Sequence, residues 1–163
     1  MRSCWLSDVA SLLSRRVVPS SITPSFCTTN AVFPNSFHTS ALAAILFGEP
    51  ESDLYTQTIH DADRCLISAA NFIELSIVIE GQTGTEALRQ CDMFFRRAGI
   101  VIEPVTVEQA HLARQAFHDF GKGRLPAGLN FGDCFTYALA RVTGEPLLFK
   151  GDDFRRTDVM PVL

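Results

Sequence analysis

The stretch Arg64-Cys-Leu-Ile-Ser-Ala69 is a short apolar run that starts at a charged residue, and Asn71 follows it closely. This pattern predicts a buried strand that leads into a helix over about residues 71–80, with Gly81 as its stop. The same alternation continues along the chain, with strands over 100–105 and 146–150 and helices over 107–119 and 132–142. Alternating strands and helices indicate a parallel sheet, and uniformly apolar strands indicate helices on both of its faces.

The rest of the chain fits the same α/β fold class. It predicts short helices over 40–47 and 51–60, an amphipathic helix over 84–98, a Gly/Pro loop over 121–129 and an edge strand over 160–163. At 163 residues the chain has the length of one domain. Hydrophobic residues make up 47% and charged residues 20%, which excludes a disordered or collagen-like chain. No apolar run is long enough for a membrane span.

The charge is unevenly distributed. The net charge is −4, which excludes a strongly basic protein that binds nucleic acid by bulk attraction but leaves open a nuclease with a local basic patch. Residues 1–37 are rich in serine and carry three arginines against one aspartate, whereas residues 38–163 are net acidic. We therefore expect 1–37 to be an atypical extension and 38–163 to be the globular domain.

Three interpretations of residues 1–37 stay open. A disordered tail and a start assigned too far upstream fit the segment equally well, and an organelle-targeting leader fits it less well. Serines interrupt the only apolar run that a secretory signal could use. The five cysteines are scattered and form no CxxC pair, which favours a reduced cytoplasm over a disulfide framework and excludes the usual zinc spacing.

Acidic residues fall where the predicted strands end. Glu74 lies one turn beyond the strand at 64–69, Asp133 begins the helix after the Gly/Pro loop, and Asp152 and Asp153 follow the strand at 146–150. Ligands of open α/β sheets bind beyond the carboxyl ends of the strands. Carboxylates gathered there would repel one another unless a cation held them, and Mg²⁺ or Mn²⁺ prefers such oxygen ligands.

Each acid also has a purely structural interpretation. Asn71 and Glu74 have the spacing of a capping box, in which Glu74 reaches back to the helix start. Asp133 in a first turn favours the helix dipole, and Asp152-Asp153 suits an ordinary turn. Only their joint placement points to a metal site.

Several motifs occur together in a fixed order. They are Thr39-Ser-Ala-Leu42, the helix with Glu74, Leu129-Asn-Phe-Gly-Asp-Cys134, and Leu147-Leu-Phe-Lys-Gly-Asp-Asp-Phe154. Over residues 38–163 this order resembles PIN-domain ribonucleases, and closely the VapC toxins of type II toxin–antitoxin systems. The stretch Phe120-Gly-Lys-Gly-Arg124, which leads to Asn130-Phe-Gly-Asp-Cys134, is typical of one VapC subgroup.

The resemblance implies a three-layer α/β/α sandwich around a short parallel sheet. It implies an endoribonuclease that depends on Mg²⁺, with Mn²⁺ as a substitute, and a homodimer held inactive by a VapB-type antitoxin. The residues that match the family's metal-binding and catalytic acids are Glu74, Asp133 and Asp153, with Asp152 as a neighbouring ligand. Ser40 matches a hydroxyl that orients a metal-bound water, and Asn130 and Thr39 match positions that support the ligands.

Lys122 and Arg124 are candidates for contacts to the RNA backbone, where they would supply positive charge that the net charge conceals. The alternative is that both residues belong to an ordinary solvated loop.

The family's first acid is missing. His38 stands where the family has aspartate, and the preceding run 33–37 contains Pro34, which predicts a poor central strand. A neutral imidazole removes one negative charge and offers nitrogen where Mg²⁺ prefers oxygen. Our hypothesis is that the chain binds Mg²⁺ weakly and cleaves RNA poorly. An alternative function is a catalytically impaired PIN domain that retains antitoxin binding and dimerisation. A metal phosphatase explains less of the motif order.

Overall fold

A four-stranded parallel sheet forms the centre of the protein. The computed structural model describes residues 36–123 and 126–163. The strands are β1 (Ser36–Phe37), β2 (Cys65–Ser68), β3 (Ile100–Glu103) and β4 (Leu147–Leu148), in the order β3-β2-β1-β4. Because every neighbouring pair is parallel, the carboxyl ends of all four strands lie at one edge of the sheet.

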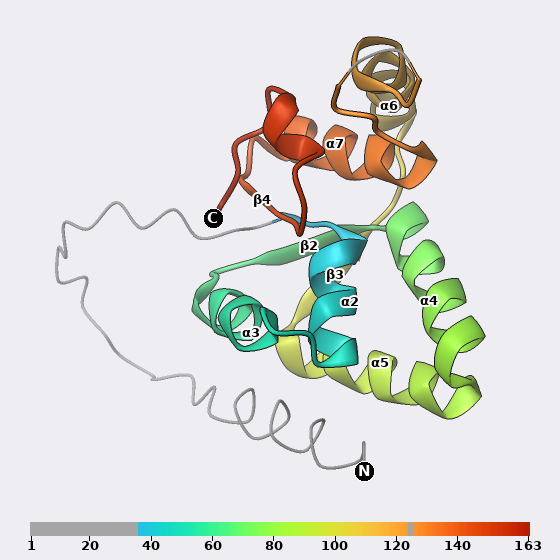
Figure 1. The fold of residues 1–163 in the computed structure, drawn as a ribbon, viewed down its shortest axis with the longest axis vertical. Helices are drawn as coiled ribbons and strands as arrows, with labels where there is room; N and C mark the ends of the chain where they lie inside the picture. Colours follow the sequence, from blue (N-terminus) through green and yellow to red (C-terminus); the bar gives the residue numbers. More distant parts are fainter. Residues whose placement is uncertain (1–35, 124–125) are drawn as a thin grey trace, which may run out of the picture.

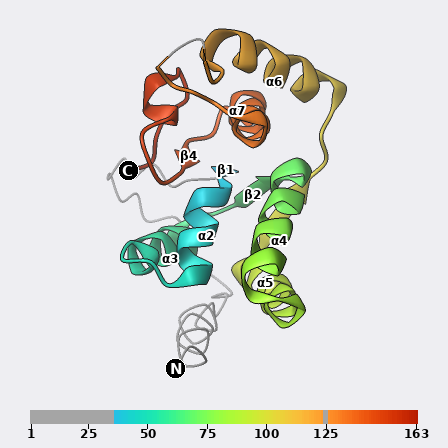
Figure 2. The ribbon, with the colours of Figure 1, turned by 45° about the vertical axis from the view of Figure 1, so that its right-hand side comes forward.

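Helices cover both faces of this sheet (Figure 1). They are α2 (Thr39–Phe47), α3 (Ser52–Asp61), α4 (Ala69–Thr83), α5 (Thr85–Ala98), α6 (Val107–Phe120) and α7 (Phe131–Thr143), followed by the 3₁₀ turn η1 (Phe154–Arg156). α6 and α7 lie on one side of the sheet, and α2, α3 and α5 lie on the other. Figure 2 shows α6 lying across α7, and α5 lying at the lower end of α4. The predicted α/β/α sandwich is confirmed.

The strands alternate their side chains between two hydrophobic cores. Phe37, Ile67 and Leu148 belong to the core with α2, α3 and α5. Leu147 and Phe149 belong to the core with α6 and α7. Burial of both faces explains why the strands read as continuous apolar runs. None of the helices in the described part of the chain is long and apolar enough to span a membrane.

The start and the end of α4 differ from the prediction. The helix begins at Ala69, with Ser68 as its N-cap residue, so Asn71 lies inside the helix and forms no capping box with Glu74. The helix also continues through Gly81 and ends at Thr83, with Gly84 as its C-cap at a φ of 81° that glycine readily adopts. A glycine inside a helix costs only about 1 kcal/mol, which the packing of a long helix can offset.

The sheet corrects three further expectations. Ser36–Phe37 is the central strand although run 33–37 predicted a poor one, and Pro34 lies outside the described residues. β3 is an edge strand whose Val101 and Ile102 are exposed, so the uniform burial expected of the strands is wrong there. The predicted strand over 160–163 is reduced to a parallel bridge between Leu147 and Pro161. Most of the predicted extension, residues 1–35, also lies outside the described residues.

Candidate active site

The starts of three helices converge where β1 and β2 end. β1 passes directly into His38, whose N–H donates to the carbonyl of Leu148 on β4 at 3.0 Å. β2 passes directly into α4, which carries Glu74 in its second turn. α7 begins after the loop at 121–129 and carries Asp133 in its first turn. The sheet edge predicted from the strand ends is therefore where His38, Glu74 and Asp133 meet.

His38 and Asp133 are in direct contact. Nε2 of His38 lies 2.8 Å from Oδ1 of Asp133, and both side chains are largely buried, at 12% and 5% exposure. His38 also lies edge-on to the ring of Phe154, which confines the imidazole from the other side. The residue predicted to stand at the position of a first acid thus bonds directly to a predicted metal ligand.

The other nitrogen of His38 faces the start of α2. Nδ1 lies 3.2 Å from the backbone N of Ser40 and 2.8 Å from its Oγ. A side chain that accepts from the N–H two residues on is an N-cap, and His38 occupies the N-cap position of α2. The imidazole is therefore held at both nitrogens, by α2 on one side and by α7 on the other.

Glu74 is held by two donors. Oγ1 of Thr39 donates to Oε2 of Glu74 at 3.1 Å, and the same hydroxyl lies 3.2 Å from Nε2 of His38. Nδ2 of Asn71, which is fully buried, donates to the same Oε2 at 3.2 Å and to the carbonyl of Gly132 at 2.9 Å. Thr39 therefore links the imidazole to Glu74, and Asn71 links Glu74 to the start of α7.

Asp133 belongs to a capping box at the start of α7. The backbone N of Asn130 donates to Oδ2 of Asp133 at 2.7 Å, and the N of Asp133 donates to Oδ1 of Asn130 at 3.0 Å. Burial raises the pKa of Asp133, but the hydrogen bond and charge of His38 and the N–H of Asn130 outweigh burial and lower this pKa below its usual value. Asp133 lies in the first turn of α7, as predicted, and its part in a capping box was not predicted. The same contacts keep a carboxylate at the site.

Ser40 connects the site to the loop after β4. Its Oγ donates to the carbonyl of Lys150 at 3.2 Å and accepts from the N–H of Lys150 at 2.9 Å. The Lys150 ammonium forms ion pairs with Glu49 and Glu51, at 2.7 and 2.9 Å. These contacts fix the backbone just before Asp152 and Asp153 against α2.

Asp152 and Asp153 are both exposed. Asp152 lies 3.8 Å from Nε of Arg155. The side chain of Asp153 makes no hydrogen bond or ion pair with any residue in the described ranges. Asp153 lies in the loop that follows β4, and its role as a metal ligand stays a prediction.

The predicted RNA contacts are only partly placed. Lys122 is exposed in the loop before α7, whereas Arg124 lies outside the described residues.

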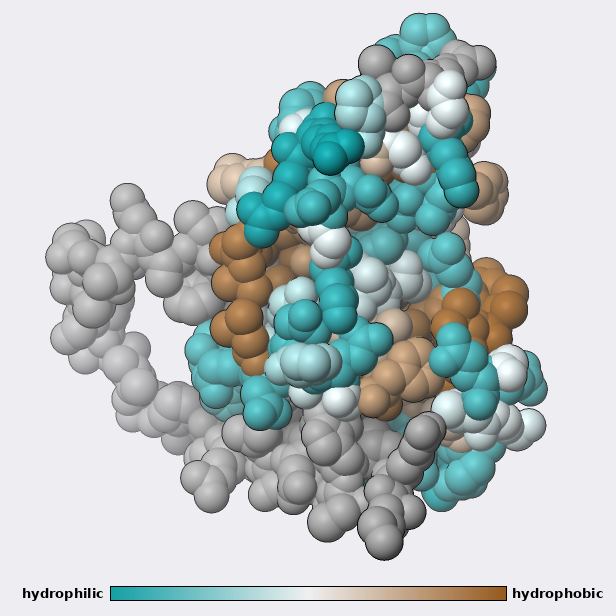
Figure 3. Space-filling model, in the orientation of Figure 1, coloured by the Kyte–Doolittle hydropathy of each residue, from teal (hydrophilic) through white to brown (hydrophobic). Residues whose placement is uncertain are grey.

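Sequence reasoning missed Phe131, which begins α7 beside the acids and is 77% exposed. It paired Asn71 with Glu74 only as a capping box, whereas in the structure the side chain of Asn71 donates to Glu74 from within the helix. Figure 3 shows apolar side chains gathered on the surface over α4, where Ile73 and Ile77 are exposed.

The donors at this site fit a divalent cation by their chemistry, although not as an all-oxygen set. As the side chains stand, no three histidine, cysteine, aspartate or glutamate residues of the described chain are arranged around a common metal position. Asp133 and Glu74 supply two carboxylates, and His38 supplies imidazole nitrogen. A cation bound by these residues would replace the direct hydrogen bond between His38 and Asp133.

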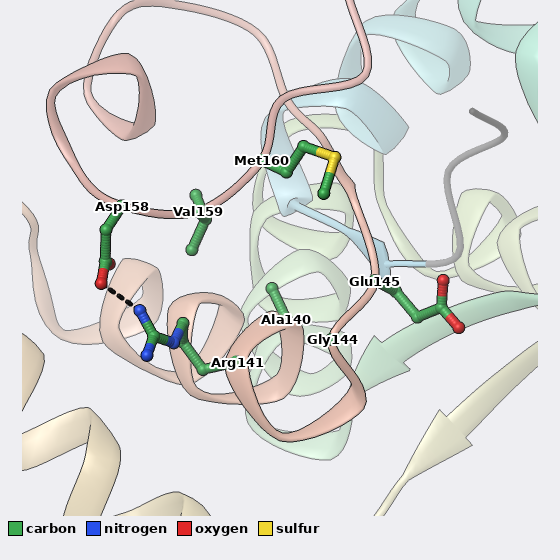
Figure 4. A pocket seen from close by; sticks show the side chains of 7 residues that line it. All are labelled: Ala140, Arg141, Gly144, Glu145, Asp158, Val159 and Met160. Atoms are coloured by element: carbon green, nitrogen blue, oxygen red, sulfur yellow. Dashed lines mark hydrogen bonds and ion pairs between the residues drawn. The ribbon is translucent and has the colours of Figure 1, made fainter. Parts of the chain in front are cut away.

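A shallow pocket of about 180 Å³ lies at the opposite end of α7. Arg141 and Asp158 form an ion pair at its side, and Glu145 and Met160 line it (Figure 4). Because Asp133 lies in the first turn of α7 and this pocket lies at its last, the pocket is separate from the candidate active site.

Comparison with known proteins places residues 38–160 in the family described as "PIN domain". "Ribonuclease VapC" of Mycolicibacterium smegmatis is 48% identical over 124 residues, which cover 76% of this chain and 96% of that protein. "Ribonuclease VapC28" of Mycobacterium tuberculosis is 47% identical over 126 residues, covering 77% and 95%. "Ribonuclease VapC30" of the same species is 43% identical over 124 residues, covering 76% and 95%.

A solved structure agrees on the fold. Mycobacterium tuberculosis VapC20, described as a "Sarcin-Ricin loop cleaving toxin", matches with a TM-score of 0.63 and 16% identity, covering 76% of this chain and 95% of that one. The resemblance carried by the ordered motifs is confirmed, and the chain belongs to the PIN-domain ribonucleases of the VapC family.

Proposed function

We propose that this chain is the toxin of a type II toxin–antitoxin pair and an endoribonuclease that hydrolyses RNA phosphodiester bonds. The observation that carries the proposal is the meeting of Glu74 and Asp133 at the carboxyl edge of the parallel sheet, each held by its own hydrogen bonds. Sequence identity of 43–48% to proteins named VapC ribonucleases supports it. We place the activity in residues 38–163 and in the cytoplasm.

The proposed work of each side chain follows from its contacts. When bound, a divalent cation supplies Lewis-acid activation of water and of the scissile phosphate. Glu74, Asp133 and Asp153 are its proposed ligands, with Asp152 as a neighbour. Mg²⁺ is the cation expected for such oxygen ligands, with Mn²⁺ as its substitute.

Other side chains hold these ligands in place. Thr39 and Asn71 orient the Glu74 carboxylate, and Asn130 orients Asp133. Ser40 ties the loop before Asp153 to α2 and is proposed to orient the attacking water.

RNA would be bound by groups around the acids. Phe131 exposes most of its ring beside Asp133, and an exposed aromatic ring provides a surface on which an unpaired base stacks. Lys122 and Arg124 are proposed to contact phosphates. Arg155 and Arg156, which follow Asp153 after one intervening residue, add positive charge near this predicted ligand.

The proposed protein partners are a VapB-type antitoxin and a second copy of the chain. Ile73 and Ile77 support a homodimer, because they lie one turn apart on α4 and expose 58% and 65% of their surfaces. The antitoxin is proposed to reach the acid site and block it.

A second function is favoured by a specific contact. His38 bonds to Oδ1 of Asp133, so the oxygen expected to face a cation already has a partner. This supports a PIN domain with impaired catalysis that keeps antitoxin binding and dimerisation.

Expression of the full chain in bacteria distinguishes the two functions. A working ribonuclease arrests growth, Asp133→Asn abolishes the arrest, and the antitoxin encoded beside the chain relieves it. The matched control is Asp158→Asn, which changes an aspartate outside the candidate site that accepts a hydrogen bond from Tyr137 of α7. An impaired domain instead binds the antitoxin, causes no arrest and gains metal-dependent cleavage of at least about tenfold in His38→Asp. A chain that neither arrests growth nor binds the antitoxin contradicts both.

A further inference from the structure

We propose that Ser68, Asn71 and Thr136 bind one buried water molecule beneath the candidate active site. The water holds the carboxamide of Asn71 in the orientation that positions Glu74. Its effect on cleavage rests on the ribonuclease activity proposed above, whereas the water site depends only on the fold. Three buried polar atoms point to this water, because none of them has a hydrogen-bond partner among the described residues.

The three atoms are Oγ of Ser68, Oδ1 of Asn71 and Oγ1 of Thr136, and all three residues are almost completely buried. They expose 1%, 0% and 1% of their surfaces. A buried polar atom without a partner is costly, and nearly all such atoms in folded proteins bond to a protein group or to an ordered water molecule. Three unpaired atoms in one region of the fold therefore indicate a bound molecule.

Thr136 does not form the hydrogen bond that its position in α7 normally provides. Thr83 and Thr143, which also lie in helices, donate to the carbonyl four residues before them, at 2.7 and 2.9 Å. The carbonyl four residues before Thr136 belongs to Gly132, and it accepts from Nδ2 of Asn71 at 2.9 Å. The hydroxyl of Thr136 is thus left beside the Asn71 carboxamide with its hydrogen-bonding capacity unused.

Ser68 also leaves its usual bond unmade. It occupies the N-cap position of α4, where a serine oxygen ordinarily accepts from an N–H of the first turn, yet its side chain forms no cap bond. Alternation along β2 places Ile67 in the core with α2, so Ser68 points to the opposite face of the sheet, which α7 covers. The Ser68 hydroxyl is therefore available to a partner between the sheet and α7.

A water molecule has the chemistry that these atoms require. Since none of the three atoms bonds to another, a molecule that both donates and accepts is needed to join them. Oδ1 of Asn71 can only accept, whereas the hydroxyls of Ser68 and Thr136 can donate or accept. A water that donates to Oδ1 and bonds to both hydroxyls satisfies all three, and about two to four polar partners are what a buried water requires.

This water fixes which end of the Asn71 carboxamide faces Glu74. Nδ2 of Asn71 donates to Oε2 of Glu74 at 3.2 Å and to the carbonyl of Gly132 at 2.9 Å. A flipped carboxamide would place Oδ1 against these two acceptors, whereas a donor held at Oδ1 favours the observed orientation. Ser68 and Thr136 therefore act through Asn71 as positioning residues, since neither hydroxyl bonds to Glu74 itself.

A crystal structure of the full chain, at a resolution that shows ordered water, tests the site directly. We expect a water molecule about 2.7–3.2 Å from Oδ1 of Asn71 and from the hydroxyls of Ser68 and Thr136. A junction of β2, α4 and α7 without ordered water, or a direct hydrogen bond from either hydroxyl to Oδ1, would overturn the inference.

The sign of a stability change gives an independent test in solution. Thr136→Val replaces the hydroxyl with a methyl group of similar shape, so it should raise the unfolding equilibrium constant about fivefold if the hydroxyl bonds to the water. Thr143→Val is the same substitution on the same helix and should change this constant by less than about threefold, because the Thr143 hydroxyl bonds within α7. Urea unfolding measures both constants. A Thr136→Val protein more stable than the wild type would mean an unpaired hydroxyl and would contradict the water site.

RNA cleavage tests the effect on Glu74. Thr136→Val should lower kcat about tenfold and leave KM unchanged, because a displaced carboxylate impairs the reaction without removing an RNA contact. Thr136→Ser keeps the hydroxyl and should restore kcat, and Thr143→Val should leave kcat unchanged. Ser68→Ala removes the other hydroxyl, should lower kcat by a similar factor, and serves if Thr136→Val does not fold. An equal loss of kcat in Thr136→Val and Thr136→Ser would contradict the positioning role.

The water site and the ribonuclease can fail separately. An ordered water and a destabilised Thr136→Val in a chain that cleaves no RNA would uphold the water site and contradict the proposed function. Cleavage of RNA with an unchanged kcat in Thr136→Val would uphold the ribonuclease and contradict the positioning role of the hydroxyl.

Discussion

Gly132 lies so close to Glu74 that a side chain at this position would collide with the carboxylate. A Cβ on Gly132 would clash with both Oε1 and Oε2 of Glu74. The start of α7 therefore fixes where the Glu74 carboxylate can be, in addition to the hydrogen bonds from Thr39 and Asn71.

Gly132→Ala should uncouple function from stability. The carboxylate is the far end of a flexible side chain, so it can move away, and the change in unfolding free energy should stay within about 1 kcal/mol. The displaced Glu74 no longer holds a cation, so Mn²⁺ affinity and RNA cleavage should fall by at least about tenfold. Urea unfolding and Mn²⁺ titration measure the two effects. Gly81→Ala on α4, where a Cβ meets nothing, is the control that should leave cation binding unchanged.

Asn130→Ala should reduce both stability and cation binding. It removes the side-chain acceptor for the N–H of Asp133 and should cost about 1 kcal/mol. Thr106→Ala removes the equivalent cap of α6, far from the acids, and provides a matched stability loss. Equal loss of Mn²⁺ affinity in both variants would mean that Asn130 contributes only through general stability.

Phe131→Ala should weaken binding of single-stranded RNA by about 1–3 kcal/mol, because it removes an exposed stacking surface. Val107→Ala is the control, since Val107 is 75% exposed at the first position of α6. Fluorescence anisotropy with a labelled RNA and the inactive Asp133→Asn background measures binding without cleavage. If Phe131→Ala binds RNA as tightly as the background protein, the ring is not part of the proposed RNA-binding surface.

Tyr137→Phe should destabilise the protein in a pH-dependent way. Tyr137 donates to Asp158 at 2.7 Å. Burial raises the pKa of Asp158, but hydrogen bonds from Tyr137 and Arg141 lower it below its usual value. A carboxyl with a lowered folded-state pKa contributes stability above its unfolded pKa, and this is lost as pH falls through the folded value.

The difference in unfolding free energy between wild type and Tyr137→Phe should therefore be about 0.5–1 kcal/mol at pH 7 and shrink toward pH 3. Urea unfolding at a series of pH values measures it. A difference that grows as the pH falls would contradict the assigned partner.

The position of the site was predictable from sequence because it depends on topology. Parallel strands end at one edge, so Glu74 and Asp133 had to approach each other once the alternation of strands and helices was recognised. The start of α4 at Ala69 was not predictable from Asn71, since Asn71 is buried and uses its amide for tertiary contacts rather than as a cap.

The contact between His38 and Asp133 was beyond sequence reasoning. The histidine was visible in the sequence, but its partner depends on the position of α7 relative to β1, which only the tertiary structure shows. The exposure of β3 could not be predicted for a similar reason. The apolar run Ile100-Val-Ile102 predicts a buried strand whether or not a helix covers it.

β1 sets a limit on how far the protein can be shortened. It has only two residues, yet Ser36 pairs with both Leu66 and Leu147, and Phe37 pairs with Leu148. A recombinant chain that starts at Ser36 retains the strand pairings found among the described residues. One that starts at His38 lacks the strand that joins its two halves, β2–β3 and β4, so the practical boundary for expression lies within these two residues.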